Sequence, residues 1–389
     1  MGSPNELRYN RPDITEDDVD AVAAVLRSGW ITTGGEAQQL EADLAAWLGV
    51  EHVVAVASCT AAIEIAVAHL RLPRGSRVGV PTWTFVSTAI AAYHRGLVPV
   101  LLDVDEDTFN LSEAAVKRAL TEDGGLDAVI GVHFGGVALP RALHELCADA
   151  AVPLVEDAAH ALGTRDHRGY VAGQGTAGCC YSFYATKNLT SAEGGALATD
   201  DAELAAFAQS FRLHGLSRDA WKRYAPGAPA SAAQYDVVGD GLKANLPDVL
   251  AALARSQLTR FDRMQAARRH LTDRYRERLG AVPGLRLVPA QADPGSADHL
   301  MMVLLPGGAD RGAVQASMQD DGVGTSVHFR PLHTFGWFRE HGLGPGPGGV
   351  PVADRSTDRA LSLPLYSGMT DADVDQACDA LERALTGAA

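Results

Sequence analysis

The stretch SFYATKNLTSAEGG, residues 182–195, places one lysine, Lys187, where a strand-like run ends and the backbone must turn tightly. Most lysines are solvated surface charges. This one follows CCYSFYA, an apolar and aromatic run at 179–185, and precedes a glutamate and two glycines. The pattern therefore predicts a lysine held at the end of a buried strand. A charged amine in such a place calls for a chemical explanation.

Short apolar runs alternate with helical patterns from about residue 14 to 245. The expected strands are residues 52–58, 77–82, 99–105, 128–134, 153–158 and 179–185. Helical patterns such as TAAIEIAVAHL lie between most of them, and another over 14–29 opens with a threonine cap and stops at a glycine. This alternation predicts an α/β fold with right-handed crossovers and a mostly parallel sheet covered by helices on both faces. Ligands collect at the carboxyl ends of the strands of such a sheet.

The last third of the chain predicts a smaller α+β unit. Its expected elements are a loop at 223–241, a long helix at 246–279, strands at 299–306 and 324–331, and a closing amphipathic helix at 370–385. We therefore expect two domains, a large domain over residues 1–250 and a small one over 251–389.

The composition narrows the classes of function. The chain has 389 residues, of which 47% are hydrophobic and 21% charged, as in an ordinary globular protein. Its net charge of −15 argues against nucleic acid as a partner, although a local site can still hold one phosphate. The five cysteines show no metal-ligand spacing, and we expect no metal site. No export signal and no apolar run of roughly 20 residues are present, so we expect a cytoplasmic protein without membrane contact.

Several residues that follow the expected strands could serve a ligand. After the first strand, SCTAAI leads into a helix, and Ser58 and Thr60 could help to cradle a phosphate or could simply cap that helix. After the second, Trp83 and Phe85 could stack on a planar ring or belong to the core. His133, after the fourth strand, is equally ambiguous.

The segment VEDAAH at 155–160 is less ambiguous, because a carboxylate at the end of an apolar strand is costly to bury without a partner. Asp157 could hold a protonated ring nitrogen, and His160 lies about one turn later. Together with a phosphate site, an aromatic ring and Lys187, this is the set of groups that pyridoxal 5′-phosphate (PLP) requires. The lysine would form an imine with the aldehyde and, once released, could carry a proton. The chain lacks the P-loop, zinc-protease and nucleophile-elbow motifs.

These residues resemble the PLP-dependent sugar aminotransferases of the DegT/DnrJ/EryC1/StrS family, which have the fold of aspartate aminotransferase (fold type I). The similar segments are VEDAAHALG, SFYATKNLTSAEGGALATD and GLKANLPDVLAALARSQL, with GWITTGGEAQQLE near the start and LSLPLY at 361–366 near the end. The resemblance extends over nearly the whole chain.

The resemblance implies roles for individual residues. Lys187 would be the Schiff-base lysine and Asp157 the partner of the pyridine nitrogen. The remaining implied cofactor contacts are Ser182 and the Thr60–Ala61 backbone at the phosphate, Phe85 on the ring, His160 where many members have glutamine, and Asn245.

Lys243 and Asn245 lie in GLKAN, where many members read GYNYR, so this loop departs from the family pattern. In members of the family, this loop reaches the active site of the neighbouring subunit. The loop at 217–240 and the segment SVHFRPLH would line the substrate cleft. Within that segment, His328 and His333 are either substrate contacts or structural histidines.

The resemblance further implies a homodimer with active sites at the subunit interface. An L-amino acid, usually glutamate, would give its amine to PLP, and the amine would then pass to a keto sugar nucleotide in amino-sugar or antibiotic biosynthesis. The EDAAH and AEGG variants favour amination at C4 of a 4-keto-6-deoxyhexose. The alternatives are a sugar dehydratase of the same family, an aminocyclitol aminotransferase, and a non-catalytic protein that binds a sugar nucleotide. The retained Lys187 argues against the dehydratase, because those members carry histidine at this position.

Overall fold

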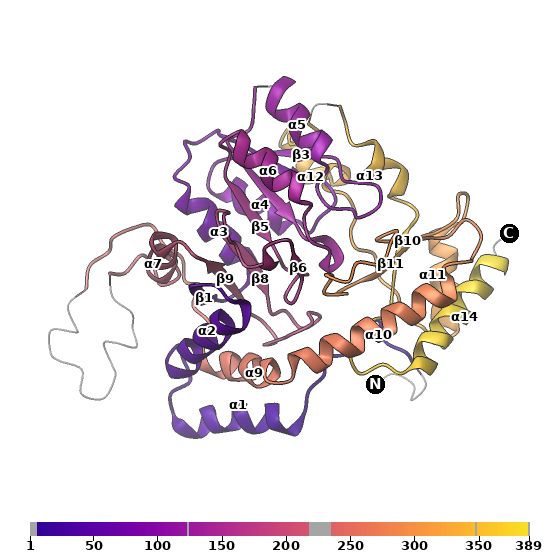
Figure 1. Ribbon diagram of the computed structural model, residues 1–389, viewed down its shortest axis with the longest axis horizontal. Helices are drawn as coiled ribbons and strands as arrows, with labels where there is room; N and C mark the ends of the chain where they lie inside the picture. Colours follow the sequence, from indigo (N-terminus) through magenta and orange to yellow (C-terminus); the bar gives the residue numbers. More distant parts are fainter. Residues whose placement is uncertain (1–5, 123, 218–234, 347, 388–389) are drawn as a thin grey trace.

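The computed structural model describes residues 6–122, 124–217, 235–346 and 348–387. At its centre is a seven-stranded sheet in the spatial order β1-β9-β8-β5-β4-β2-β3 (Figure 1). Its strands are β1 (His52–Val56), β2 (Arg77–Pro81), β3 (Val98–Leu102), β4 (Ala128–Val132), β5 (Leu154–Asp157), β8 (Cys179–Ser182) and β9 (Gly195–Thr199). Strand β9 pairs antiparallel with both of its neighbours, and all other pairs are parallel. The prediction of a mostly parallel α/β sheet is therefore confirmed.

Helices cover both faces of this sheet. They are α2 (Gly35–Leu48), α3 (Cys59–His69), α4 (Ser87–His94), α5 (Glu113–Glu122), α6 (Arg141–Asp149), α7 (Ala202–Phe211) and α9 (Asp248–Leu258). Alternate side chains of β1 point to opposite faces of the sheet and pack in two different cores. Val54 and Val56 pack into a core with α3, α4 and α7, whereas Val53 and Ala55 pack with α2 and α9. Helices α5 and α6 cover the second face at the β3–β4 end.

Short elements surround the large sheet. They are α1 (Glu16–Ser28), the hairpin of β6 (Arg165–Asp166) and β7 (Gly169–Tyr170), and the 3₁₀ turns η1 (Phe134–Gly136) and η3 (Leu332–Thr334). Helix α1 has the expected cap, because Thr15 and Asp18 form a capping box, and it ends at Gly29 in the left-handed conformation. It packs against α9, beside the large sheet (Figure 1).

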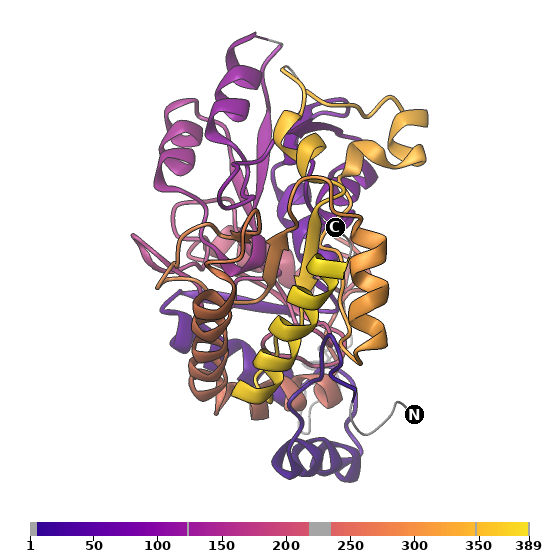
Figure 2. The ribbon, with the colours of Figure 1, turned by 90° about the vertical axis from the view of Figure 1, so that its right-hand side faces the viewer.

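A second, three-stranded antiparallel sheet lies in the C-terminal part. Its order is β10 (Arg286–Val288), β11 (Met301–Leu304), β12 (Ala360–Leu363). The helices of this part of the chain are α10 (Phe261–Leu279), α11 (Arg311–Asp320), α12 (Gly336–Glu340), α13 (Pro351–Ser356) and α14 (Asp371–Gly387), of which α12 packs through Phe338 against the large sheet. Helix α14 packs against both α10 and α11 (Figure 2). The closing helix is thus where the sequence places it.

Two expectations for this part were wrong. The pattern at 246–279 is two helices, α9 and α10, because the chain bends at Arg260, which binds Asp18 of α1, and then buries Phe261. The segment 324–331 is not a strand. Only Ser326 forms a bridge, to Ser362 of β12, and the chain then turns into the large cavity described below. An extended sequence pattern becomes a strand only if a neighbouring strand supplies a full ladder of hydrogen bonds.

Some predictions stay open. The division at 250/251 falls inside α9 and stays a prediction. Most of the expected loop at 223–241 and of the cleft-lining loop at 217–240 lies outside the described residues. Among the residues that the structure describes, no helix combines the length and apolar character needed to cross a membrane.

Candidate active site

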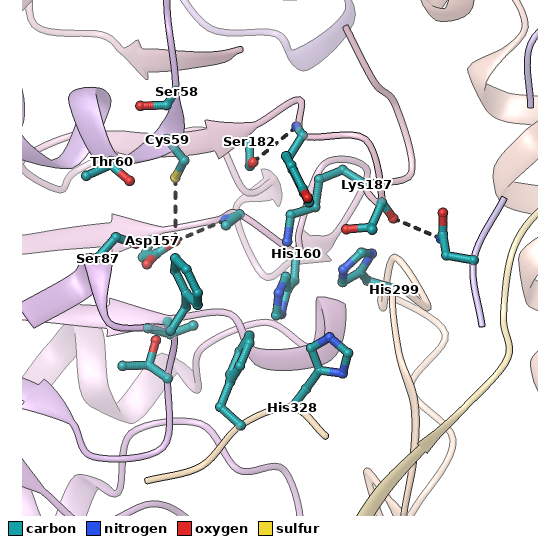
Figure 3. A pocket seen from close by; sticks show the side chains of 18 of the residues that line it. Ser58, Cys59, Thr60, Ser87, Asp157, His160, Ser182, Lys187, His299 and His328 are labelled. Carbon is teal, nitrogen blue, oxygen red and sulfur yellow. Dashed lines mark hydrogen bonds between the residues drawn. The ribbon is translucent and has the colours of Figure 1, made fainter. Parts of the chain in front are cut away.

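A cavity of about 550 Å³ opens at the carboxyl ends of β5 and β8 (Figure 3). Its walls come from distant parts of the chain. The large sheet and its loops contribute Asp157, His160, Ser182 and Lys187; the amino-terminal segment contributes Tyr9 and Asn10; the C-terminal part contributes His299, Ser326, His328 and Phe329. The sheet topology explains this position, because all strands of the large sheet except β9 run in the same direction and end at the same edge.

Lys187 extends its amine into this cavity (Figure 3). It follows β8 in a turn in which its backbone N–H donates to the carbonyl of Tyr184 at 2.9 Å. Burial lowers the pKa of Lys187 to about 8, while the nearby Cys59 and Asp157 oppose the shift. A substantial fraction of this amine is therefore neutral near pH 7 to 8, which an amine needs in order to act as a nucleophile or a base.

Asp157 ends β5 and lies across the cavity from the lysine (Figure 3). One carboxylate oxygen accepts from the Thr88 hydroxyl at 2.7 Å, and the other accepts from the Ala159 backbone N–H at 3.1 Å. Burial raises the pKa of Asp157, and these hydrogen bonds with the charge of Lys187 only partly offset the rise. The carboxylate is thus buried against neutral donors, and a cationic group bound beside it would stabilise its charged form.

The first turn of α3 lies at another side of the cavity. Ser58 caps this helix by accepting from the Ala61 backbone N–H at 3.2 Å. Within the described part of the chain, the backbone N–H groups of Cys59 and Thr60 have no hydrogen-bond partner. Ser58, Cys59, Thr60 and Ser182 all line the cavity. Free N–H groups at a helix N-terminus, beside hydroxyl groups, form a phosphate-binding site.

Aromatic rings close the remaining sides. Phe85 keeps 57% of its surface exposed at the cavity, where its ring lies 5.9 Å from that of Phe329. His160 is buried, stacks on Phe329 and packs at a tilt against His299. Burial holds the pKa of His160 well below its usual value, so the ring is neutral.

The structure separates the other predicted residues from this cavity. The backbone N–H of Ala61 donates to the side chain of Ser58, so it is not free for the predicted phosphate contact. The N–H groups of this turn that the described residues leave free are those of Cys59 and Thr60. Lys243 donates to Asn245, which in turn donates to Thr33 at 2.5 Å, and neither lines the cavity. This position leaves open their predicted role at the neighbouring subunit.

The two remaining substrate candidates differ. His328 lines the cavity, and its Nδ1 lies 3.0 Å from the hydroxyl of Ser362. His333 does not line it, and its two ring nitrogens contact Thr82 at 2.8 Å and Asp354 at 3.0 Å. These contacts favour the structural interpretation for His333.

Two ambiguous residues belong to the interior. Trp83 is fully buried, and its indole N–H donates to the carbonyl of His328 at 3.1 Å. His133 is also fully buried, with its Nε2 lying 3.4 Å from Glu156. Both are therefore structural residues.

Sequence reasoning missed several cavity residues. They are Tyr9, Asn10, Cys59, Ser87, Tyr184, Thr186, His299 and Phe329. Asn10 donates to the carbonyl of Thr186 at 3.2 Å, which holds the amino-terminal segment against the lysine loop. Cys59 lies in SCTAAI and Tyr184 in SFYATK, two segments predicted to form the site, so both could have been predicted as cavity residues. His299 and Asn10 had no local signal, because only the fold brings them to the lysine.

The cavity fits PLP on the evidence of its own groups. The buried carboxylate of Asp157 would meet the protonated ring nitrogen, Lys187 the aldehyde, and the first turn of α3 the phosphate. Glycine at position 195 fits this arrangement, since a Cβ there would lie 2.6 Å from the backbone nitrogen of Cys59.

Comparisons with known proteins indicate the family, the fold and the cofactor. The sequence profile of the DegT/DnrJ/EryC1/StrS aminotransferase family matches residues 12–382. Spr1654 from Streptococcus pneumoniae, assigned as a sugar aminotransferase and solved in its PMP form, is 27% identical with a TM-score of 0.89, over 98% of this chain and 100% of that chain. The aminotransferase TlmJ from Streptoalloteichus hindustanus is 29% identical with a TM-score of 0.85, over 98% and 99%. DesI, solved in the presence of its TDP-sugar product, is 28% identical with a TM-score of 0.82, over 99% and 94%.

Proposed function

This chain belongs to the DegT/DnrJ/EryC1/StrS aminotransferase family, and we propose that it transfers the amino group of L-glutamate to a nucleotide-linked keto sugar. It is a PLP-dependent sugar aminotransferase. The proposed acceptor is a 4-keto-6-deoxyhexose, and the proposed setting is amino-sugar biosynthesis in the cytoplasm, including that of antibiotic sugars. The observation that carries the proposal is the pairing of Lys187 with Asp157 across one cavity.

Each residue contributes a defined action. PLP, when bound, supplies an aldehyde that condenses with amines and a ring that takes up the electron pair of a broken C–H bond. Asp157 would hold the ring nitrogen protonated, because its own buried charge needs a cation. Lys187, with a pKa of about 8, would take the proton from the substrate carbon and return it to a neighbouring carbon.

We further propose a homodimer. Lys243 lies exposed outside the cavity of its own subunit, bound to Asn245. In a dimer, this loop would supply polar groups to the partner's cavity. Sedimentation of the purified protein tests the assembly, and Lys243→Ala should raise the KM for the amino acceptor without changing the KM for glutamate.

One observation favours a second acceptor class. Among the described residues that line the cavity, Lys187 is the only lysine or arginine. A nucleoside diphosphate carries negative charge that several cations usually neutralise. An uncharged aminocyclitol precursor would need none of them, so an aminocyclitol ketone is the alternative acceptor.

A panel of acceptors separates these proposals. The reconstituted protein should show a visible absorption band that glutamate removes, and Lys187→Ala should lack it. Formation of 2-oxoglutarate is then measured with dTDP-, UDP- and GDP-linked 4-keto and 3-keto sugars and with an aminocyclitol ketone. We expect turnover with a 4-keto sugar nucleotide. Turnover with the aminocyclitol ketone alone would overturn the acceptor assignment, and release of a deaminated sugar would indicate a dehydratase.

A further inference from the structure

Three histidines surround the amine of Lys187 in the cavity. They are His160, His299 and His328 (Figure 3). Burial lowers the pKa of all three, that of His328 to about 4, and the positive charge of Lys187 acts in the same direction. All three rings are therefore neutral at neutral pH. A neutral imidazole has one nitrogen that donates and one that accepts, so its role depends on its tautomer.

The hydrogen bonds of Asn188 decide the tautomer of His299. The amide nitrogen of Asn188 lies 2.7 Å from the carbonyl oxygen of Ala297, which can only accept. The same nitrogen donates to the side-chain oxygen of Gln265 at 2.8 Å. The amide oxygen of Asn188 is therefore the atom that lies 2.8 Å from Nδ1 of His299, and this Nδ1 must carry the proton.

The neighbouring ring has the opposite tautomer. Nδ1 of His160 accepts from the backbone N–H of Gly135 at 3.3 Å. A backbone N–H can only donate, so the proton of this neutral ring is on Nε2. The rings of His160 and His299 pack against each other with their centroids 4.4 Å apart and an interplanar angle of 33°. The pair thus combines one donor nitrogen and one acceptor nitrogen beside Lys187.

Nε2 of His299 is left with a lone pair. The described residues give this atom no hydrogen-bond partner, although His299 is 94% buried and lines the cavity. Figure 3 shows its ring between Lys187 and His328. Nε2–H of His160 is one nearby donor, but its ring packs against that of His299 at an interplanar angle of 33°, and the hydrogen bonds of the described residues do not join the two rings. The other nearby donor is the amine of Lys187, which sits on a flexible side chain and always has an N–H to offer. We propose that His299 is a positioning residue that accepts a hydrogen bond from the free amine of Lys187 through Nε2.

This contact matters in the proton-transfer step. In the reaction with glutamate, Lys187 would take the proton from the C–H bond that breaks at the α-carbon, and bound PLP would supply the ring that accepts the electron pair. The resulting ammonium has three N–H bonds, and one proton must return to a different carbon. A fixed acceptor would hold the ammonium in one orientation during this transfer, which is how positioned hydrogen bonds increase rates.

The surroundings keep His299 in this role. The charged or titratable groups that face it are His160, Lys187, Arg268 and His328, and all of them oppose its protonation. Arg268 also donates to the backbone carbonyl of His299 at 2.7 Å. His299 is thus an acceptor of hydrogen bonds and not a store for the proton itself.

The first test reads the tautomers directly. ¹⁵N spectra of the full-length protein labelled at histidine should show His299 with its proton on Nδ1 and His160 with its proton on Nε2, with and without PLP. The lines are assigned by His299→Phe and His160→Gln. An Nε2-protonated or charged His299 at neutral pH would overturn the proposal without any activity measurement.

The second test uses the reaction of glutamate with the PLP-loaded enzyme in the absence of any amino acceptor. His299→Phe keeps the ring shape but loses the acceptor. We expect its rate to fall about tenfold, the effect of one hydrogen bond to a charged group, with a larger isotope effect for α-deuterated glutamate. The half-saturating glutamate concentration should change less than about twofold, and His299→Gln should recover much of the rate.

A matched control is His333→Phe, since this histidine lies outside the cavity with both nitrogens bonded. An unchanged rate and isotope effect in His299→Phe, or a change confined to glutamate binding, would refute the proposal. The inference rests on PLP-dependent transamination, but no keto sugar enters either test. Failure of the proposed acceptor would therefore leave both results intact.

Discussion

The carboxylates of Glu156 and Asp157 are adjacent in sequence but serve opposite faces of the large sheet. Glu156 accepts from Arg168 at 2.7 Å and from His144 at 3.0 Å, away from the cavity. Asp157 faces the cavity and accepts from Thr88 at 2.7 Å. Successive strand residues point to opposite faces of a sheet. Glu156 therefore joins a buried ion-pair network, whereas Asp157 faces the cavity.

Replacing Glu156 tests how much its buried ion pairs stabilise the fold. Glu156→Gln removes one of the two buried carboxylates that bind Arg168, the other being Asp166, and we expect the free energy of unfolding to fall by about 2 kcal/mol at neutral pH. Urea denaturation measures this. Glu145→Gln, in an exposed pair with Arg141, is the control and should cost at most about 0.5 kcal/mol. Equal losses in the two variants would show that the buried network does not stabilise the fold.

Glu156 should also make stability depend on acid pH. Its hydrogen bonds and the facing cations hold the pKa of Glu156 well below its usual value despite burial. As the pH falls below about 4.3, the unfolded chain takes up a proton that the folded protein does not, so stability is lost. Glu156→Gln should show a shallower loss in this range in urea titrations at each pH.

Asp157 should be essential for the chemistry and not for the fold. Asp157→Asn cannot stabilise a protonated ring nitrogen, and we expect the glutamate reaction to slow at least 10²-fold. Stopped-flow absorbance of the PLP-loaded protein measures the rate. Thr88→Val, which removes only a hydrogen bond to Asp157, should slow it by about tenfold. A normal rate in Asp157→Asn would contradict the assignment of the ring-nitrogen partner.

Gly195 should set the affinity for the cofactor. A Cβ at this position would lie 2.5 Å from the carbonyl oxygen of Tyr181 and 2.6 Å from the backbone nitrogen of Cys59, so the first turn of α3 must move. We expect Gly195→Ala to weaken PLP binding by about tenfold or more in an absorbance titration. Gly307→Ala has open space around its Cβ and should bind PLP normally. Equal PLP affinities of Gly195→Ala and Gly307→Ala would show that the phosphate does not bind at the first turn of α3.

His328 should contribute to acid sensitivity at a higher pH than Glu156 does. Burial lowers the pKa of His328 from 6.5 to about 4. Between these values the unfolded chain binds a proton that the folded ring does not, so stability falls as the pH falls through this window. His328→Asn should lose about 2 kcal/mol less than the wild type between about pH 7 and pH 4. An identical pH dependence would mean that His328 is charged in the folded protein.

The elements that the sequence predicts well are those with local causes. Six predicted strands overlap β1 to β5 and β8, because each is a short apolar run between turn residues. Strand β9 was missed, since GALAT is short and made of small residues, and its partners β1 and β8 decide its conformation. The segment 324–331 was overpredicted for the converse reason, as it has strand-like residues and only one bridge.

The sequence by itself indicated the chemistry of this protein, because Asp157 and Ser182 end two strands and Lys187 follows the second, and these strands end at one edge of a parallel sheet. Only the tertiary structure decided how the lysine amine is surrounded. Asn188 and His299 are 111 residues apart, and the tautomer of the histidine depends on which end of the amide faces it. No local pattern encodes the direction of such a hydrogen bond. It follows from the carbonyl of Ala297, which packing against α10 places beside the amide.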